Sequence, residues 1–168
     1  MIAVGIDPGL TGAIAFVDHR SCVIEDLPTM ELPGDGMVRR KIDGRAFAEM
    51  VRRHCAPGES VRVFCEAVHA IAGKPGGKQI GGTIQSQASL MRSLGAIEAV
   101  LEALRMPPEM VFPQRWKRFY QLDGDKKAAL KKARELYPEV ADTTLRMAKN
   151  HNRAEALLIA HWGLRVHE

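Results

Sequence analysis

The amino-terminal sequence reads Ile2-Ala3-Val4-Gly5-Ile6-Asp7-Pro8-Gly9-Leu10-Thr11-Gly12-Ala13-Ile14-Ala15-Phe16-Val17. Two short apolar runs, 2–6 and 13–17, flank a turn bounded by Gly9 and Gly12, and this pattern predicts two strands joined tightly. A second turn at 18–20 leads into a third apolar run at 22–24. Three strands joined by such short turns form an antiparallel meander.

The rest of the chain alternates helical and extended patterns. We predict a fourth strand at 61–66 and a fifth at 110–112, with helices at 45–54, 83–105, 114–120, 125–137 and 152–165. The segment 28–44 contains two prolines and three glycines and predicts a loop. Strands four and five are reached through helices, so right-handed crossovers make them parallel to the first strand. The order predicts an α/β fold whose five-stranded mixed sheet is flanked by helices.

Composition excludes several classes of protein. At 168 residues, with 46% hydrophobic and 26% charged residues, the chain fits one globular domain and is neither disordered nor fibrous. Asp7 interrupts the first apolar run too early for a secretory signal, and no apolar run reaches eighteen residues. We therefore expect a cytoplasmic protein with no membrane partner. The three cysteines lack C-x-x-C spacing, which argues against a disulfide framework or a zinc site.

Two carboxylates end predicted parallel strands. Asp7 closes the first strand and Glu66 closes the fourth. Ligands and catalytic groups of open α/β sheets gather at such strand ends, and neighbouring strands lie about 4.8 Å apart. Paired carboxylates in an oxygen-rich site favour Mg²⁺ or Mn²⁺ over zinc. The alternative is structural: Asp7 begins an Asp-Pro-Gly turn, and Glu66 is a solvent-facing strand end.

The last predicted helix supplies a third carboxylate. Glu155 lies within the small and apolar segment 154–160, which predicts close packing of this helix against the sheet. Asn152 and His151 precede Glu155 by three and four positions and share its helix face. Three carboxylates and one further oxygen or nitrogen ligand could hold two divalent ions of the kind that hydrolyse phosphodiesters.

These residues carry a resemblance to a known family. The chain resembles the RuvC family of Holliday junction resolvases, especially its phage-type members, in the segment 5–12, the strand-ending Glu66 and the segment 153–160. The likeness also includes the segments 113–117 and 125–138, so it extends over nearly the full chain. The resemblance implies one ribonuclease H-like nuclease domain over residues 1–168, a homodimer, and Mg²⁺-dependent nicking of four-way DNA junctions in recombination and repair, with Mn²⁺ able to substitute. It assigns catalytic and metal-binding roles to Asp7, Glu66, Asn152 and Glu155.

Asn152 departs from the family pattern, which has Asp or sometimes His at this position. An amide oxygen can ligate a metal but brings no charge, so the second ion should bind more weakly and the chain should be slow or inactive. Either His151 supplies the fourth ligand, or Asn152 is a nearly isosteric replacement of an acid. An alternative function is a non-catalytic protein that binds branched DNA on the same fold.

Basic residues are clustered along the chain. Residues 115–134 contain eight basic and two acidic residues, a local charge of +6, which leaves −2 for the rest of the chain. Such clusters suit backbone phosphates, although a solvated helix face gives the same pattern. Arg39-Arg40-Lys41 forms a smaller run that faces either solvent or DNA. Candidate DNA-binding residues are Arg115, Lys117, Arg118, Lys126, Lys127, and Lys74 and Lys78 in a glycine-rich segment; His69 stands where the family often has an aromatic wedge.

Other readings of the first motif remain. The turn after Asp7 also resembles the first phosphate motif of actin-like and sugar-kinase ATPases, but those proteins enclose a nucleotide between two domains, and 168 residues supply one. Among nuclease substrates, three-way junctions, flaps and RNA/DNA hybrids fit these residues as well as four-way junctions do.

Overall fold

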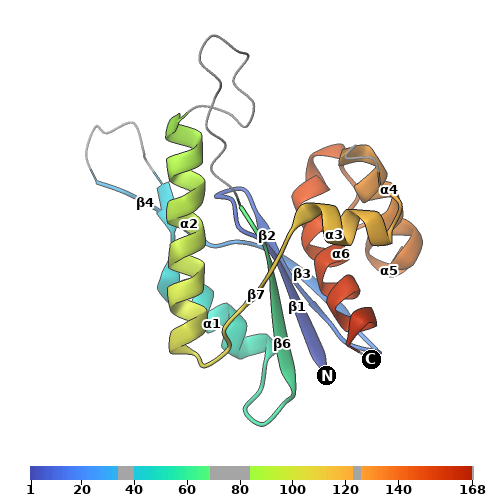
Figure 1. Ribbon diagram of the computed structural model, residues 1–168, viewed down its shortest axis with the longest axis horizontal. Helices are drawn as coiled ribbons and strands as arrows, with labels where there is room; N and C mark the ends of the chain where they lie inside the picture. Colours follow the sequence, from blue (N-terminus) through green and yellow to red (C-terminus); the bar gives the residue numbers. More distant parts are fainter. Residues whose placement is uncertain (34–39, 69–83, 123–125, 168) are drawn as a thin grey trace.

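A five-stranded mixed sheet forms the centre of the protein. The computed structural model describes residues 1–33, 40–68, 84–122 and 126–167, with the backbone alone for Lys126. The sheet has the order β3-β2-β1-β6-β7 (Figure 1), in which β1 pairs antiparallel with β2 and parallel with β6. This arrangement confirms the predicted sheet. Its strands are β1 (Ile2–Asp7), β2 (Ala13–Val17), β3 (Cys22–Asp26), β6 (Val61–Glu66) and β7 (Glu109–Val111).

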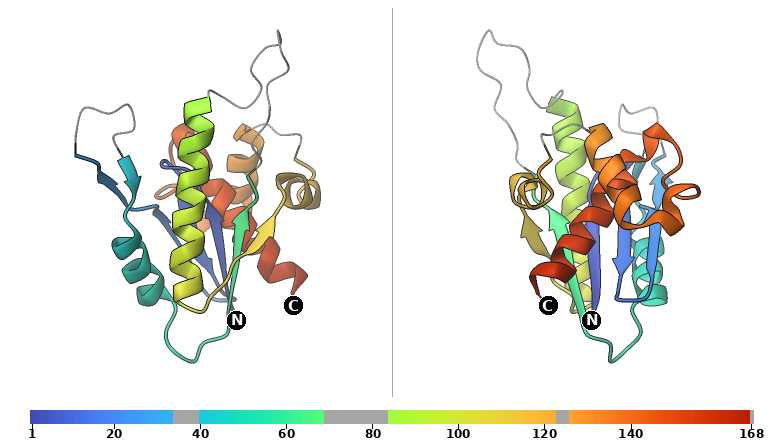
Figure 2. Two further views of the ribbon diagram at one scale, coloured as in Figure 1. Left: turned by 60° about the vertical axis from the view of Figure 1, so that its left-hand side comes forward. Right: turned by 90° about the vertical axis from the view of Figure 1, so that its right-hand side faces the viewer.

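Helices cover both faces of the sheet. On one face lie α1 (Gly44–His54) and α2 (Ile84–Ala103), and on the other lie α3 (Pro113–Phe119), α4 (Lys126–Leu136), α5 (Pro138–Ala141) and α6 (His151–Val166), as Figures 1 and 2 show. The helix α2 packs against the sheet through Leu94, Ile97 and Leu101. No helix among these elements is both long and apolar enough to cross a bilayer.

The helix α6 lies unusually close to β1. A Cβ atom on Gly5 would stand 2.2 Å from the Ala156 carbonyl oxygen and 2.3 Å from the Ala160 amide nitrogen, so glycine is required there. Farther along, Gly163 faces the Phe64 ring in the same way. The chain begins and ends at one end of the sheet (Figure 1), so α6 runs antiparallel to β1 and starts beside the carboxyl ends of β1 and β6. The predicted close packing is confirmed.

One expectation about local structure is wrong, and two short elements were not predicted. The segment 28–44, predicted to be a loop, contains the antiparallel strands β4 (Thr29–Glu31) and β5 (Arg40–Ile42). They are three residues each and flanked by proline and glycine, so the sequence pattern is dominated by turn residues. The short α5 and the 3-10 turn η1 (Ala148–Asn150) are also absent from the sequence-based prediction.

Candidate functional site

Asp7 and Glu66 lie side by side at the carboxyl ends of two parallel strands. Each directly follows the paired residues Ile6 and Cys65. Side chains alternate along a strand, so Asp7 shares the face of Gly5, and Glu66 shares the face of Phe64. Both of those residues contact α6. The two carboxylates therefore project toward the helix that carries Glu155, and we call Asp7, Glu66 and Glu155 the acidic centre.

Glu66 is buried and electrostatically perturbed within the acidic centre. Its Oε2 atom is buried and accepts no hydrogen bond. Burial, followed by the charges of Asp7 and Glu155, raises the pKa of Glu66 to about 7, and the Lys117 ammonium and the Trp116 indole N–H offset part of this rise. The structural alternative for Glu66, a solvent-facing strand end, is wrong because this side chain is largely enclosed. A buried carboxylate beside two others is stabilised by a bound cation.

Glu155 faces a lysine from α3. The Lys117 Nζ atom lies 3.3 Å from Glu155 Oε1, and the two side chains are 24% and 12% exposed. The same ammonium lies 5.0 Å from the centroid of the buried Trp116 ring. Pro113 occupies the first turn of α3, a position where proline favours helix initiation. Lys117 thus supplies counter-charge to the acidic centre.

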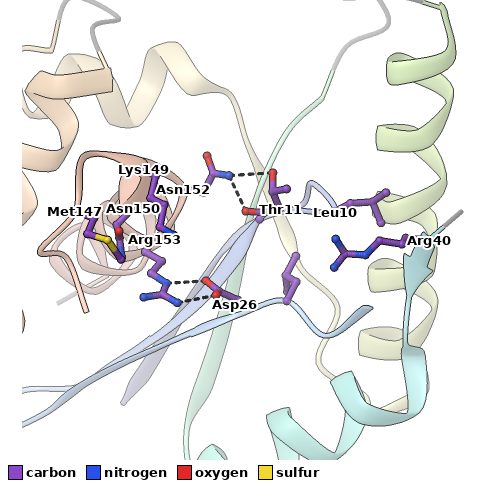
Figure 3. Close-up of a pocket in the computed structure, with 11 residues that line it drawn as sticks. Leu10, Thr11, Asp26, Arg40, Met147, Lys149, Asn150, Asn152 and Arg153 are labelled. Atoms are coloured by element: carbon purple, nitrogen blue, oxygen red, sulfur yellow. Dashed lines mark hydrogen bonds and ion pairs between the residues drawn. The ribbon is translucent and has the colours of Figure 1, made fainter. Parts of the chain in front are cut away.

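Asn152 is tied to the turn that follows Asp7. Its Nδ2 atom donates to the Thr11 carbonyl oxygen at 2.6 Å and to Thr11 Oγ1 at 3.2 Å (Figure 3). The side-chain carbonyl is therefore the part of this amide that a metal could use. His151, the first residue of α6, is half-buried one position earlier. Both candidates for the fourth ligand thus begin the helix that carries Glu155.

The donor set fits a hard divalent cation. Among the described residues, no three His, Cys, Asp or Glu side chains converge into a ready cage. The unpartnered Glu66 oxygen and the neighbouring carboxylates nevertheless offer oxygen ligands of the kind that Mg²⁺ and Mn²⁺ prefer.

A fourth acid at this edge of the sheet escaped the sequence analysis. Asp26 ends β3 level with Ala13, which is itself level with Asp7. Its two carboxylate oxygens accept from Arg153 Nε and Nη2, each at 2.6 Å. The available signal was its position at the end of a strand, which it shares with Asp7 and Glu66.

The structure brings part of the predicted DNA-binding set together. Arg115, Lys117 and Arg118 line a groove of about 980 Å³ beside α3, together with the exposed Phe112. Lys127 is exposed near the start of α4, where the backbone of Lys126 begins the helix. His69, Lys74 and Lys78 lie outside the described residues. The groove adjoins the acidic centre because Lys117 lines the groove and also contacts Glu155.

Comparisons with known proteins bear on the fold. No protein-family model and no curated protein matches the sequence. The chain is similar to a structure of RuvC from Thermus thermophilus, with a TM-score of 0.55 and 13% sequence identity over 99% of this chain and 97% of that one. The likeness shows a RuvC-like fold, and it confirms the expected ribonuclease H-like architecture.

Proposed function

We propose that the protein is a structure-selective endonuclease that resolves four-way DNA junctions with the help of divalent metal ions. The observation that carries the proposal is the acidic centre: Glu66 has a buried, unpartnered oxygen and an elevated pKa between two further carboxylates. This centre lies at the carboxyl edge of a sheet with a RuvC-like fold. Functional groups in open α/β sheets collect at that edge.

Asp7, Glu66 and Glu155 would hold the metal, with the Asn152 carbonyl or His151 as a further ligand. Mg²⁺ is the expected ion, and Mn²⁺ should substitute. Two such ions supply a hydroxide at neutral pH and neutralise the oxygen that leaves the phosphodiester.

The protein's own residues prepare this chemistry. The closely packed α6 fixes Glu155 against the strands that carry Asp7 and Glu66. With no metal bound, the elevated pKa lets Glu66 retain a proton near neutral pH, which limits repulsion within the acidic centre. Arg115 and Arg118 in the neighbouring groove supply positive charge for backbone phosphates.

We further propose that the protein acts as a homodimer. Two symmetric cuts in a four-way junction require two acidic centres related by a two-fold axis. The outer side of α2 exposes Ile84 and Met91, which are 81% and 42% exposed, and apolar residues of this kind suit a protein interface. Light scattering coupled to gel filtration tests this part directly: a mass of one chain would contradict it.

A second candidate is a protein that binds branched DNA without cutting it. Asn152 brings no charge, and its amide group is engaged by Thr11. Lys117 already balances the charge of Glu155. Both observations favour an acidic centre with weak affinity for a second ion.

A substrate panel separates these functions. Four-way, three-way, flap, RNA/DNA hybrid and linear DNA substrates would be incubated with Mg²⁺, Mn²⁺ or EDTA. We expect metal-dependent cleavage of the four-way junction, loss of cleavage in Glu66→Gln, and no loss in Glu139→Gln, an exposed glutamate on α5. Tight junction binding without cleavage in either metal, even for Asn152→Asp, would select the binding protein. Preferential cleavage of another substrate would reassign the specificity.

A further inference from the structure

A second basic cavity lies on the β3 side of the acidic centre. It has a volume of about 360 Å³ and is bounded by the turn after β1, the strand β5, the turn η1 and the start of α6 (Figure 3). The polar residues that matter here are Thr11, Asp26, Arg40, Lys149, Asn152 and Arg153. Thr11 belongs to the turn that follows Asp7, and Asn152 lies three residues before Glu155 on α6, so the two sites are neighbours.

The cavity carries net positive charge. Among the described residues that line it, three side chains are cationic and Asp26 is the one carboxylate. Arg153 is fully engaged: Nε and Nη2 donate to Asp26, and Nη1 donates to the Thr144 carbonyl oxygen at 3.2 Å. This pair neutralises Asp26, so the charges of Arg40 and Lys149 remain for a ligand.

Those two cations are held on opposite sides of the cavity. Arg40 reaches in from β5, while Lys149 belongs to η1 next to α6 (Figure 3). The Arg40 guanidinium also donates to Thr29 across the β4–β5 pair. Asn150 Nδ2 donates to the Thr144 carbonyl oxygen and thereby fixes the turn that carries Lys149. The cavity is therefore built by the fold before any ligand arrives.

The register of the sheet sets the distance to the acidic centre. Asp26, Ala13 and Asp7 are level on β3, β2 and β1. Two strand spacings amount to about 10 Å. Neighbouring phosphates of one strand lie farther apart than the axial rise of about 3.4 Å, because the strand winds around the helix axis, so about 10 Å corresponds to one or two nucleotides.

We propose that this cavity seats a backbone phosphate of the DNA strand, one or two nucleotides from the phosphate at the acidic centre, with Arg40 and Lys149 as its cationic ligands. The inference rests on the proposed function, because it takes the acidic centre as the place of the scissile phosphate. It gives the cut strand a second fixed point on the β3 side, across from the groove beside α3. The short basic run noted at 39–41 then has one member that faces DNA.

Salt dependence of junction binding tests the two ligands. Arg40→Gln and Lys149→Gln remove charge, and Arg45→Gln, whose side chain is 90% exposed on α1, is the matched control. Binding to a labelled four-way junction would be measured in EDTA at several salt concentrations. Each cavity variant should weaken binding several-fold, and the double variant Arg40→Gln/Lys149→Gln should reduce the slope of log K against log salt by about 0.9, because the two residues share one phosphate. Slopes equal to that of the control would overturn the proposal.

Uncharged analogues of single phosphates locate the contact between the cavity and the DNA strand. A single methylphosphonate linkage would be placed at each of the five positions on either side of the cut or expected cut. In the unmodified protein, the linkage one or two nucleotides away should weaken binding. In the double variant Arg40→Gln/Lys149→Gln, the same linkage should have no further effect, since both changes remove one interaction. Additive effects at every position would contradict the proposal.

A small phosphate compound is the alternative ligand for this cavity, because it presents the same anionic group as the DNA backbone. Inorganic phosphate and ATP would be tested for a rise in melting temperature. Stabilisation that the double variant loses, with junction binding unchanged, would assign the cavity to a small phosphate ligand and overturn the DNA assignment. Failure of the proposed nuclease would be seen separately, as absent cleavage despite a localised methylphosphonate effect.

Discussion

The Lys117 ammonium lies 3.3 Å from Glu155 and balances part of the charge of the acidic centre. It also lowers the pKa of Glu66, against the stronger effects of burial and of Asp7 and Glu155. A lysine in this position competes electrostatically with a bound metal. The affinity of the acidic centre for a metal should therefore depend on the charge of this residue on α3.

Replacing Lys117 should strengthen metal binding. Lys117→Gln removes a positive charge at a largely enclosed site, so Mn²⁺ affinity should rise about fivefold, equivalent to roughly 1 kcal/mol. Isothermal titration with Mn²⁺ measures this change. The control is Lys131→Gln on α4, whose side chain is 81% exposed and which should leave the affinity unchanged. Weaker Mn²⁺ binding by Lys117→Gln would contradict the assigned role.

The stability of the metal-free protein should depend on the proton of Glu66. Its pKa is raised from 4.5 to about 7 in the folded state. As pH rises through this interval, the unfolded chain releases the proton first, so the free energy of unfolding falls and the full penalty is present above pH 7. Glu66→Gln should therefore stabilise the protein at pH 8 by on the order of 2 kcal/mol and change little at pH 4.

Urea unfolding in EDTA at the two pH values measures this difference. Glu139→Gln, exposed on α5, is the control and should behave alike at both. If Glu66→Gln were less stable than the unmodified protein at pH 8, the result would show that ionised Glu66 does not destabilise the folded protein.

Asn152→Asp should increase cleavage and metal affinity together. The added carboxylate can ligate a metal, but it cannot donate to the Thr11 carbonyl as the amide does. The metal-free variant should therefore lose about 1 kcal/mol of stability, which Mn²⁺ restores. Cleavage should rise at least tenfold, measured under single-turnover conditions. Unchanged cleavage, together with loss of activity in His151→Ala, would assign the fourth ligand to His151 instead.

The close approach of α6 to β1 should make Gly5 intolerant of substitution. Gly5→Ala places a methyl group against the backbone of Ala156 and Ala160, so unfolding should cost about 3 kcal/mol less than in the unmodified protein. Gly95→Ala is the matched control, because its Cβ meets open space in the middle of α2 and should stabilise by about 0.5–1 kcal/mol. Equal unfolding midpoints for Gly5→Ala and the unmodified protein would contradict the packing that places Glu155.

The sequence predicts the strands and helices that are marked by a local pattern of apolar residues. The meander, the strand ending at Glu66 and the long helix α2 follow from apolar runs and their spacing, and they are confirmed. The β4–β5 pair was missed because two strands of three residues are stabilised by pairing with each other, which no local pattern records.

The candidate site likewise combines residues that local sequence patterns predict with contacts that such patterns do not predict. Strand ends pointed to Asp7 and Glu66, and the small residues around Glu155 indicated a helix pressed against the sheet. The pairing of Lys117 with Glu155 joins α3 to α6 and could not be predicted from sequence, where Lys117 is one member of a basic run. The cavity between Arg40 and Lys149 likewise joins segments more than a hundred residues apart. Their DNA-binding roles stay predictions.

The most direct test is single-turnover cleavage of a four-way junction labelled on each strand in turn. The unmodified protein and Asn152→Asp should nick two opposed strands at symmetric positions in Mn²⁺, with no nicks in EDTA and at least a thousandfold slower nicking by Glu66→Gln, a loss typical of removing a principal catalytic group. Intact strands with both proteins in Mn²⁺, or equal nicking by Glu66→Gln, would contradict the acidic centre as a metal-dependent nuclease site.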